Sequence, residues 1–199
     1  MSVWIPQGST VFDDEPTKGS RFLALVRHTD AAPLAMQAVA DAQARWPDAS
    51  HHCFAYRLAS GTHRSSDDGE PSGSAGPPIL AMIDGHDMVD TTVVVARWFG
   101  GTKLGVGGLI RAYGGCAGRA LDAAPRAPYI PEVEVRLCFA YPDTNAVEQA
   151  LTAHDVRIID ADYADRVSLT LRLATAALHG LQESLRDGTA GRVQAIASP

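Results

Sequence analysis

The sequence predicts an α+β protein of two domains, which we assign to residues 1–126 and 129–199. Patterns typical of strands and helices alternate along the chain, and the C-terminal part has the order βαββαβ, which predicts a ferredoxin-like domain. A segment rich in alanine and proline, residues 123–128, is interpreted as a linker between the two. Hydrophobic residues make up 46% of the 199 positions, which is enough for real cores.

The N-terminal domain begins with two predicted strands, at residues 3–6 and 20–27, separated by a polar stretch. A helix follows over residues 30–46, because Pro33 is tolerated in a first turn and Pro47 ends the pattern.

Residues 51–58 alternate as a strand does. Phe54 and Tyr56 share one face of this strand. Cys53 and Ala55 share the other face.

The rest of the N-terminal domain is predicted to be two helices around a buried strand. Ser74 is expected to cap a helix that ends at Gly85, and the β-branched run 91–99 is typical of a buried strand. Residues 108–124 predict a helix although its interior contains Gly114, Gly115 and Gly118, each costing about 1 kcal/mol relative to alanine. We expect these glycines to allow close packing of the helix on a sheet.

The C-terminal domain shows the most regular alternation in the chain, with short loops between its elements. Its strands are predicted at residues 133–139, 156–160, 166–173 and 192–196, and its helices at 143–154 and 175–186.

Composition predicts a cytoplasmic protein with reduced thiols and no membrane association. No apolar run approaches the roughly 20 residues needed to span a bilayer, and the N-terminus lacks the pattern of a secretory signal. The odd number and wide spacing of the cysteines, Cys53, Cys116 and Cys138, argue against a disulfide framework. Cys116 is expected to be a packed apolar group, and no metal site or cofactor is predicted.

Charge is distributed unevenly along the chain. The net charge of −6 disfavours a surface covered with nucleic-acid-binding charge, and no DNA specificity is expected. Residues 91–128, however, carry five positive side chains and one negative, a net charge of +4. Two interpretations stay open: a phosphate-binding surface, or scattered solvated arginines.

Two glycine-dense blocks, residues 65–78 and 97–114, surround the buried strand. The second block leads into a helix start near Lys103, and backbone N–H groups at such a start favour anions. The dinucleotide fingerprint is incomplete because Ile110 occupies its third glycine position, and the P-loop spacing is absent. The block therefore predicts either an anion site or glycines that permit tight packing.

Three carboxylates in the first block, Asp67, Asp68 and Glu70, form an acidic cluster on a loop. Such a cluster could hold a hard cation such as Mg²⁺. We favour the alternative, a turn in which Asp67 or Asp68 accepts hydrogen bonds from backbone N–H groups.

The motifs at residues 18–22, 51–57, 66–76 and 97–114 resemble the signatures of the YigZ/IMPACT family. They span residues 18–121, and the tail is similar to the second domain of the bacterial members in pattern only. The resemblance implies an N-terminal fold shared with domains of ribosomal proteins and elongation factors and with some small-molecule kinases, followed by a ferredoxin-like domain. Eukaryotic members regulate a translation kinase with an additional N-terminal RWD domain. Because the motif starts near residue 18, we expect no such domain here and do not transfer that function.

The resemblance and the +4 segment favour a translation-associated protein that binds RNA or the ribosome through a basic, glycine-rich surface. One alternative is an enzyme or sensor for a nucleotide or small phosphorylated ligand, with Mg²⁺ at the acidic cluster. Another is a protein-interaction regulator of translation with Trp98 and Phe99 as exposed anchors. No catalytic residue is assigned. The residues expected to contact phosphate are Arg57, Arg64, Arg97, Lys103, Gly105, Gly107, Gly108 and Arg111.

Overall fold

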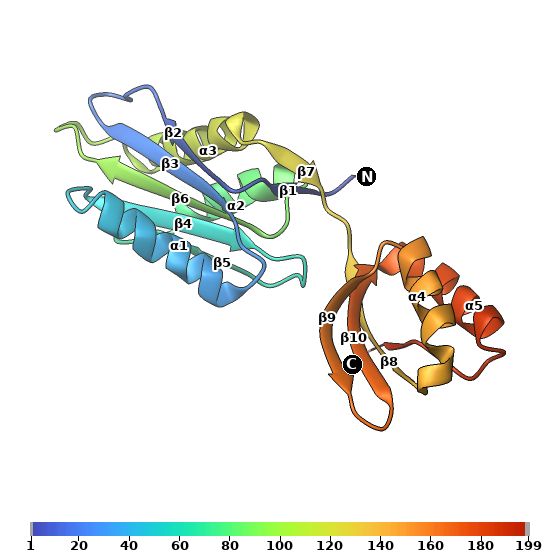
Figure 1. The fold of residues 1–199 in the computed structure, drawn as a ribbon. Helices are drawn as coiled ribbons and strands as arrows, with labels where there is room; N and C mark the ends of the chain where they lie inside the picture. The colour runs from blue at the N-terminus through green and yellow to red at the C-terminus, as the bar shows by residue number, and fades with distance from the viewer. Residues whose placement is uncertain (1, 198–199) are drawn as a thin grey trace. The chain divides into compact units, whose positions relative to one another are not determined.

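The computed structural model describes residues 2–197, which form two compact units (Figure 1). The first unit extends to Tyr129 and the second begins at Ile130. Both combine helices with antiparallel strands around cores of their own, which confirms the α+β prediction. Within the described residues, no helix has both the length and the apolar character needed to cross a membrane.

The first unit is built on a five-stranded antiparallel sheet in the order β2-β3-β6-β4-β5. Helix α1 covers one face, and α2 and α3 cover the other (Figure 1). The strands are β2 (Ser9–Asp13), β3 (Arg21–His28), β4 (His51–Arg57), β5 (His63–Ser66) and β6 (Thr91–Trp98), and the helices are α1 (Ala32–Arg45), α2 (Gly76–Gly85) and α3 (Val106–Ala123).

The alternation predicted for residues 51–58 is confirmed by the two cores of this sheet. Phe54 and Tyr56 lie in the core under α1. Cys53 and Ala55 lie in the core under α2 and α3. Each fully buried large apolar side chain contributes about 1.5–3 kcal/mol, so a one-residue shift of β4 would exchange both faces at a large cost.

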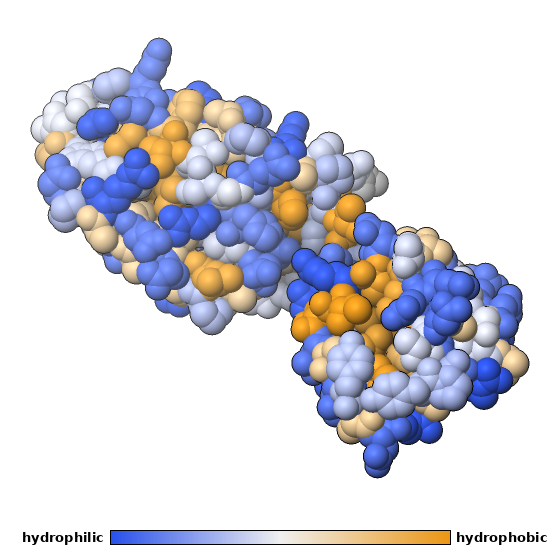
Figure 2. Space-filling model, in the orientation of Figure 1, coloured by the Kyte–Doolittle hydropathy of each residue, from blue (hydrophilic) through white to orange (hydrophobic). Residues whose placement is uncertain are grey.

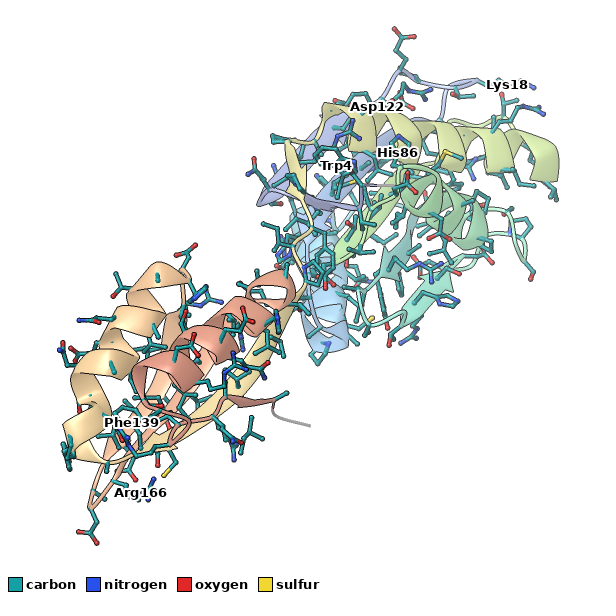
Figure 3. All side chains as sticks on the ribbon, turned by 90° about the vertical axis from the view of Figure 1, so that its right-hand side faces the viewer. Trp4, Lys18, His86, Asp122, Phe139 and Arg166 are labelled. Carbon is teal, nitrogen blue, oxygen red and sulfur yellow. The ribbon has the colours of Figure 1, made fainter. Side chains whose placement is uncertain are left out.

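Two glycines of α3, Gly114 and Gly118, face another helix instead of the sheet that we expected. An added Cβ at Gly118 would lie 3.3 Å from Sδ of Met82 on α2, and one at Gly114 would also meet α2. The two helices therefore approach closely, and Figure 3 shows His86, which directly follows α2, beside Asp122 of α3, with Nε2 and Oδ1 3.1 Å apart. The large side chains of α3 face the sheet.

Three short strands were not predicted as such. Residues 123–128, interpreted as a linker, contain β7 (Arg126–Pro128), which pairs with β1 (Trp4–Pro6). Strands β2 and β5 form the two edges of the large sheet. Edge strands are short and half solvated, so they lack the apolar run that identifies β6.

The second unit has the strand order β11-β8-β10-β9, with all neighbours antiparallel and two helices packed on one face. This is the arrangement of a ferredoxin-like domain and confirms that prediction. Its last strand is only two residues long. The elements are β8 (Glu132–Phe139), α4 (Thr144–Ala153), β9 (Arg157–Tyr163), β10 (Val167–Ala174), α5 (Leu178–Gly188) and β11 (Ile196–Ala197).

The edge strand β9 is exposed along its whole length. Its side chains Ile158, Ile159 and Tyr163 are all at least 44% exposed. Figure 2 shows hydrophobic residues gathered on this side of the second unit.

Candidate functional site

A cavity of about 330 Å³ opens in the first unit between one end of the sheet, the acidic loop and the start of α3. The register of β4 and β6 creates it, because His51 pairs directly with Arg97. Both glycine-dense blocks therefore contribute to one site. The lining residues are His51, Glu70, Pro71, Arg97, Phe99, Lys103, Leu104, Gly105, Val106 and Leu109.

The polar part of the cavity wall is a buried ion pair between Arg97 and Glu70. Both side chains are 5% exposed, and Nη1 of Arg97 donates to Oε1 of Glu70 at 2.5 Å. Tyr113 donates its hydroxyl proton to the same oxygen at 2.7 Å. Burial raises the pKa of Tyr113, so this hydroxyl stays protonated and remains a donor. Nε2 of His51 lies 3.9 Å from the carboxylate.

Arg97 has hydrogen-bonding capacity that the described residues do not use. Its guanidinium carries five N–H donors. One contacts Glu70 and another donates to Oγ of Ser20 at 3.2 Å. Within residues 2–197, Nε is buried and has no partner. An unpaired buried donor is costly, so this Nε is a polar atom that the described residues leave unsatisfied in a side chain that lines the cavity.

Helix α3 begins at the mouth of the same cavity. Gly105 precedes it with φ 71° and ψ 162°, and no side chain among the described residues caps the helix start. Lys103 is exposed beside this start. Nη1 of Arg111 lies 3.8 Å from the position that a Cβ at Gly107 would take. The first amides of α3 and two cationic side chains therefore lie together, an arrangement that favours anions.

The acidic cluster is a tight turn, as we favoured. The N–H of Glu70 donates to the carbonyl of Asp67 at 2.9 Å, and Asp68 and Gly69 have φ values of 43° and 84°. Positive φ at both central positions defines a type I′ turn. Oδ2 of Asp68 accepts the backbone N–H of His52 at 2.6 Å. In the described part of the chain, no three such side chains are arranged to hold a metal ion.

The start of α2 is capped by Asp67, and the prediction that Ser74 caps it is wrong. Oδ1 of Asp67 accepts N–H bonds from Ala75 at 2.9 Å and Gly76 at 2.8 Å, and Oδ2 accepts one from Gly73 at 2.8 Å. The hydroxyl of Ser74 donates instead to a backbone carbonyl three residues earlier. A carboxylate from the preceding turn reaches the helix start and satisfies donors that a single hydroxyl could not.

We expect the Asp67→Ala variant to be destabilised by about 2 kcal/mol at pH 7, because three backbone donors lose their acceptor. Burial acts to raise the pKa of Asp67, but the three N–H bonds outweigh it and lower the pKa overall. A lowered folded-state pKa gives stability that is present above the unfolded-state pKa and is lost as pH falls through the folded value. Urea unfolding at neutral and acidic pH measures the difference, which should shrink in acid.

Asp48→Ala is the control for this variant, since Asp48 is an exposed aspartate of the same unit. It should change the free energy of unfolding by less than about 0.5 kcal/mol at either pH. An Asp67→Ala variant as stable as Asp48→Ala would contradict the capping role.

The basic residues predicted to form one surface fall into two groups. Arg97, Lys103 and Gly105 line the cavity, although Arg97 is buried in its wall and does not lie on the surface that we expected. Gly107, Gly108 and Arg111 follow in the first turns of α3. Arg57 is at the other end of β4, six residues from His51, which is about 20 Å along a strand. Arg64 lies near it on β5, paired with Tyr56.

Arg57 is also neutralised, because it donates to both carboxylate oxygens of Asp84. Arg64 stacks over Phe54, with Cζ 5.9 Å from the ring centre.

The +4 charge of residues 91–128 is partly neutralised by distant carboxylates. Arg97 pairs with Glu70, and Arg119 pairs with Asp14. The positive charge that remains at the α3 start comes from Lys103 and Arg111.

Sequence reasoning did not place His51, Phe99 and Tyr113 in one site. Only the pairing of β4 with β6 and the path of α3 bring them together, and neither leaves a local signal in the sequence. Phe99 is 52% exposed, as expected of an anchor, whereas Trp98 packs partly against the core under α1.

The two buried cysteines are inert groups. Burial raises the pKa of Cys53 to about 12 and that of Cys116 to about 12, so neither is a thiolate at neutral pH. This confirms that Cys116 is a packed side chain.

The fold and the cavity define a two-domain α+β protein whose N-terminal unit presents an uncapped helix start beside a buried ion pair. A family model described as the Impact N-terminal domain matches residues 18–121. A second model, described as Domain of unknown function (DUF1949), matches residues 137–192. The chain belongs to the IMPACT family.

Relatives resemble the chain over nearly its whole length. The IMPACT family member YigZ of Escherichia coli is 35% identical, covering 99% of this chain and 98% of the relative. A Thermus thermophilus protein named "IMPACT family member in pol 5'region" is 40% identical over 87% of this chain and 96% of its own length. A solved structure titled "Crystal structure of an hypothetical protein" superposes with a TM-score of 0.80 at 35% identity, covering 100% and 98% of the two chains.

Proposed function

We propose that this protein is a translation-associated protein that binds RNA, free or within the ribosome, through phosphate contacts at the start of α3. The observation that carries the proposal is the uncapped helix start with Lys103 and Arg111 beside it. A second observation supports it independently: Arg97, which lines the adjoining cavity, has donors without partners among residues 2–197.

The chemistry of the α3 start suits a phosphodiester. Backbone N–H groups and the helix dipole bind the phosphate oxygens, while lysine and arginine supply charge without reading sequence. The net charge of −6 opposes binding elsewhere on the molecule, so contact should be confined to this place. Binding should therefore be weak and sensitive to salt.

The double variant Lys103→Glu/Arg111→Glu should bind a short single-stranded RNA roughly tenfold or more weakly at low salt, since two phosphate contacts become repulsive. Fluorescence anisotropy over a salt series measures the effect. For two neutralised phosphates on a single strand, the slope of log affinity against log salt should be about −1.4 in the wild type and smaller in the variant.

Arg64→Glu is the matched control for this experiment, because Arg64 is an exposed cation at the other end of β4. It should leave affinity within about twofold, a change of roughly 0.4 kcal/mol. Wild-type affinity in the double variant, or an equal loss in Arg64→Glu, would contradict the assignment of the surface.

The cavity favours a second candidate, a sensor or enzyme for a small phosphorylated ligand. Its volume of about 330 Å³ is at the lower end of the range for small-molecule sites. Mg²⁺ is not part of this candidate, because Asp67 and Asp68 already accept backbone N–H groups. This second candidate would be favoured if nucleotides raised the melting temperature of the protein equally with and without Mg²⁺ while the protein showed no affinity for RNA.

A further inference from the structure

We propose that the cavity beside α3 is a subsite for one nucleotide base of the bound RNA. The base stacks on Phe99 and hydrogen-bonds to the Arg97–Glu70 pair, while its phosphate lies at the α3 start. This inference rests on the proposed function, because RNA supplies the nucleotide.

The buried pair has hydrogen-bonding capacity that its described neighbours leave unused. Arg97 makes two of its five possible hydrogen bonds within residues 2–197, and its Nε has no partner there. On Glu70, Oε1 accepts from both Arg97 and Tyr113, whereas Oε2 has no partner among the described side chains. A charged donor and a charged acceptor thus lie side by side in the wall of the cavity.

Such a pair complements the edge of a base. The edge of each base carries a hydrogen-bond donor next to an acceptor. The donor of the base can therefore bond to Glu70 while its acceptor receives a bond from Arg97. A phosphodiester of RNA has no proton to donate to Glu70, and the carboxylate would repel its negative charge. The ion pair is therefore suited to a base, and the helix start is suited to the phosphate.

The remainder of the cavity wall is apolar and includes an aromatic ring. Phe99 lines it, is 52% exposed, and has its ring centre 5.6 Å from Cζ of Arg97. Leu104, Val106 and Leu109 supply the other apolar walls. An aromatic ring held by a guanidinium and still half exposed is a platform on which a base can stack.

Charge is distributed unevenly within the site. The buried pair is neutral as a unit, and Lys103 at the rim adds the positive charge. A nucleotide has the same division, with an uncharged base and an anionic phosphate. Because a donor and an acceptor together fit several bases, we expect little discrimination among them.

The test compares a short single-stranded RNA with an abasic oligomer of equal length and charge. The wild type should bind the RNA about 5- to 150-fold more tightly, which is the range for stacking one base on an aromatic side chain. Phe99→Ala should lower the affinity for RNA to that for the abasic oligomer, and it should leave abasic binding unchanged. Because Phe99 is half exposed, the variant should keep its fold.

Leu34→Ala is the matched control, since Leu34 is also 52% exposed and lies on α1, which covers the opposite face of the sheet. Equal affinity of the wild type for both oligomers would overturn the base subsite and leave the proposed function standing. Binding of neither oligomer would overturn the proposed function. In that case nucleoside monophosphates, titrated by NMR, decide the subsite: shifts at Phe99 and Arg97 support it, and their absence overturns it.

Discussion

Replacing Gly100 with alanine should destabilise the first unit by about 3 kcal/mol or more. A Cβ at this position would overlap backbone atoms of Gly19 and Ser20, which no rotamer change can relieve. Overpacking that moves backbone costs about 1–3 kcal/mol even in tolerant cores, and two loops must separate here. Urea unfolding followed by the fluorescence of the tryptophans in this unit would measure the loss.

The reciprocal contact makes the effect specific to this pair of loops. An added Cβ at Gly19 would lie 2.8 Å from the carbonyl oxygen of Gly100. Gly85→Ala is the control, because a Cβ there meets nothing within 4 Å and its φ is not positive. That variant should be neutral or should stabilise the protein by up to about 1 kcal/mol, since alanine fits the end of a helix better than glycine. A Gly100→Ala protein of wild-type stability would mean that the two loops do not touch.

The contact matters because it holds the cavity in place. Oγ of Ser20 accepts hydrogen bonds from the N–H of Gly100 and from Nη2 of Arg97, each at 3.2 Å. If the loops separate, Arg97 loses one of its two partners. A partly folded Gly100→Ala protein should therefore also lose the geometry of the proposed site.

Sequence reasoning succeeded where the determining interactions are local. The alternation of β4, the apolar run of β6 and the acidic turn each depend on residues close together in the chain. The turn shows this well, because Asp68 and Gly69 tolerate positive φ and Asp67 accepts the N–H groups that follow it.

Interactions between distant segments could not be predicted in this way. The charge count for residues 91–128 gave a basic surface because the partners of Arg97 and Arg119 lie 27 and 105 residues earlier. The register that pairs His51 with Arg97 could not be predicted from the alternation of apolar residues either. That alternation shows which face of the sheet a side chain occupies, but it does not show which residue of the neighbouring strand lies opposite. The cavity is a product of that register. Arg97, Lys103 and Gly105 were singled out from the sequence, whereas His51 and Phe99 join them only through the pairing of β4 with β6.

Glu70→Leu should destabilise the protein by about 3–5 kcal/mol, because it leaves the Arg97 guanidinium buried without its counter-charge. The variant also removes the acceptor of the Tyr113 hydroxyl. Replacing both charges with apolar groups avoids the isolated cation, so Glu70→Leu/Arg97→Met should be more stable than Glu70→Leu alone. A double-mutant cycle in urea measures the coupling between the two residues.

The control for this cycle is Asp13→Asn, whose carboxylate pairs with Arg21 at 2.8 Å while both side chains are more than half exposed. An exposed pair of this kind contributes at most about 1 kcal/mol, because water and salt screen it. If Glu70→Leu cost no more than Asp13→Asn, the Arg97–Glu70 pair would not be desolvated. If the double variant were as unstable as Glu70→Leu, the loss would come from Tyr113 and packing, and the unpaired charge of Arg97 would not be its cause. If the pair is buried as described, Glu70→Leu should lower the free energy of unfolding strongly, and the double variant should regain part of that loss.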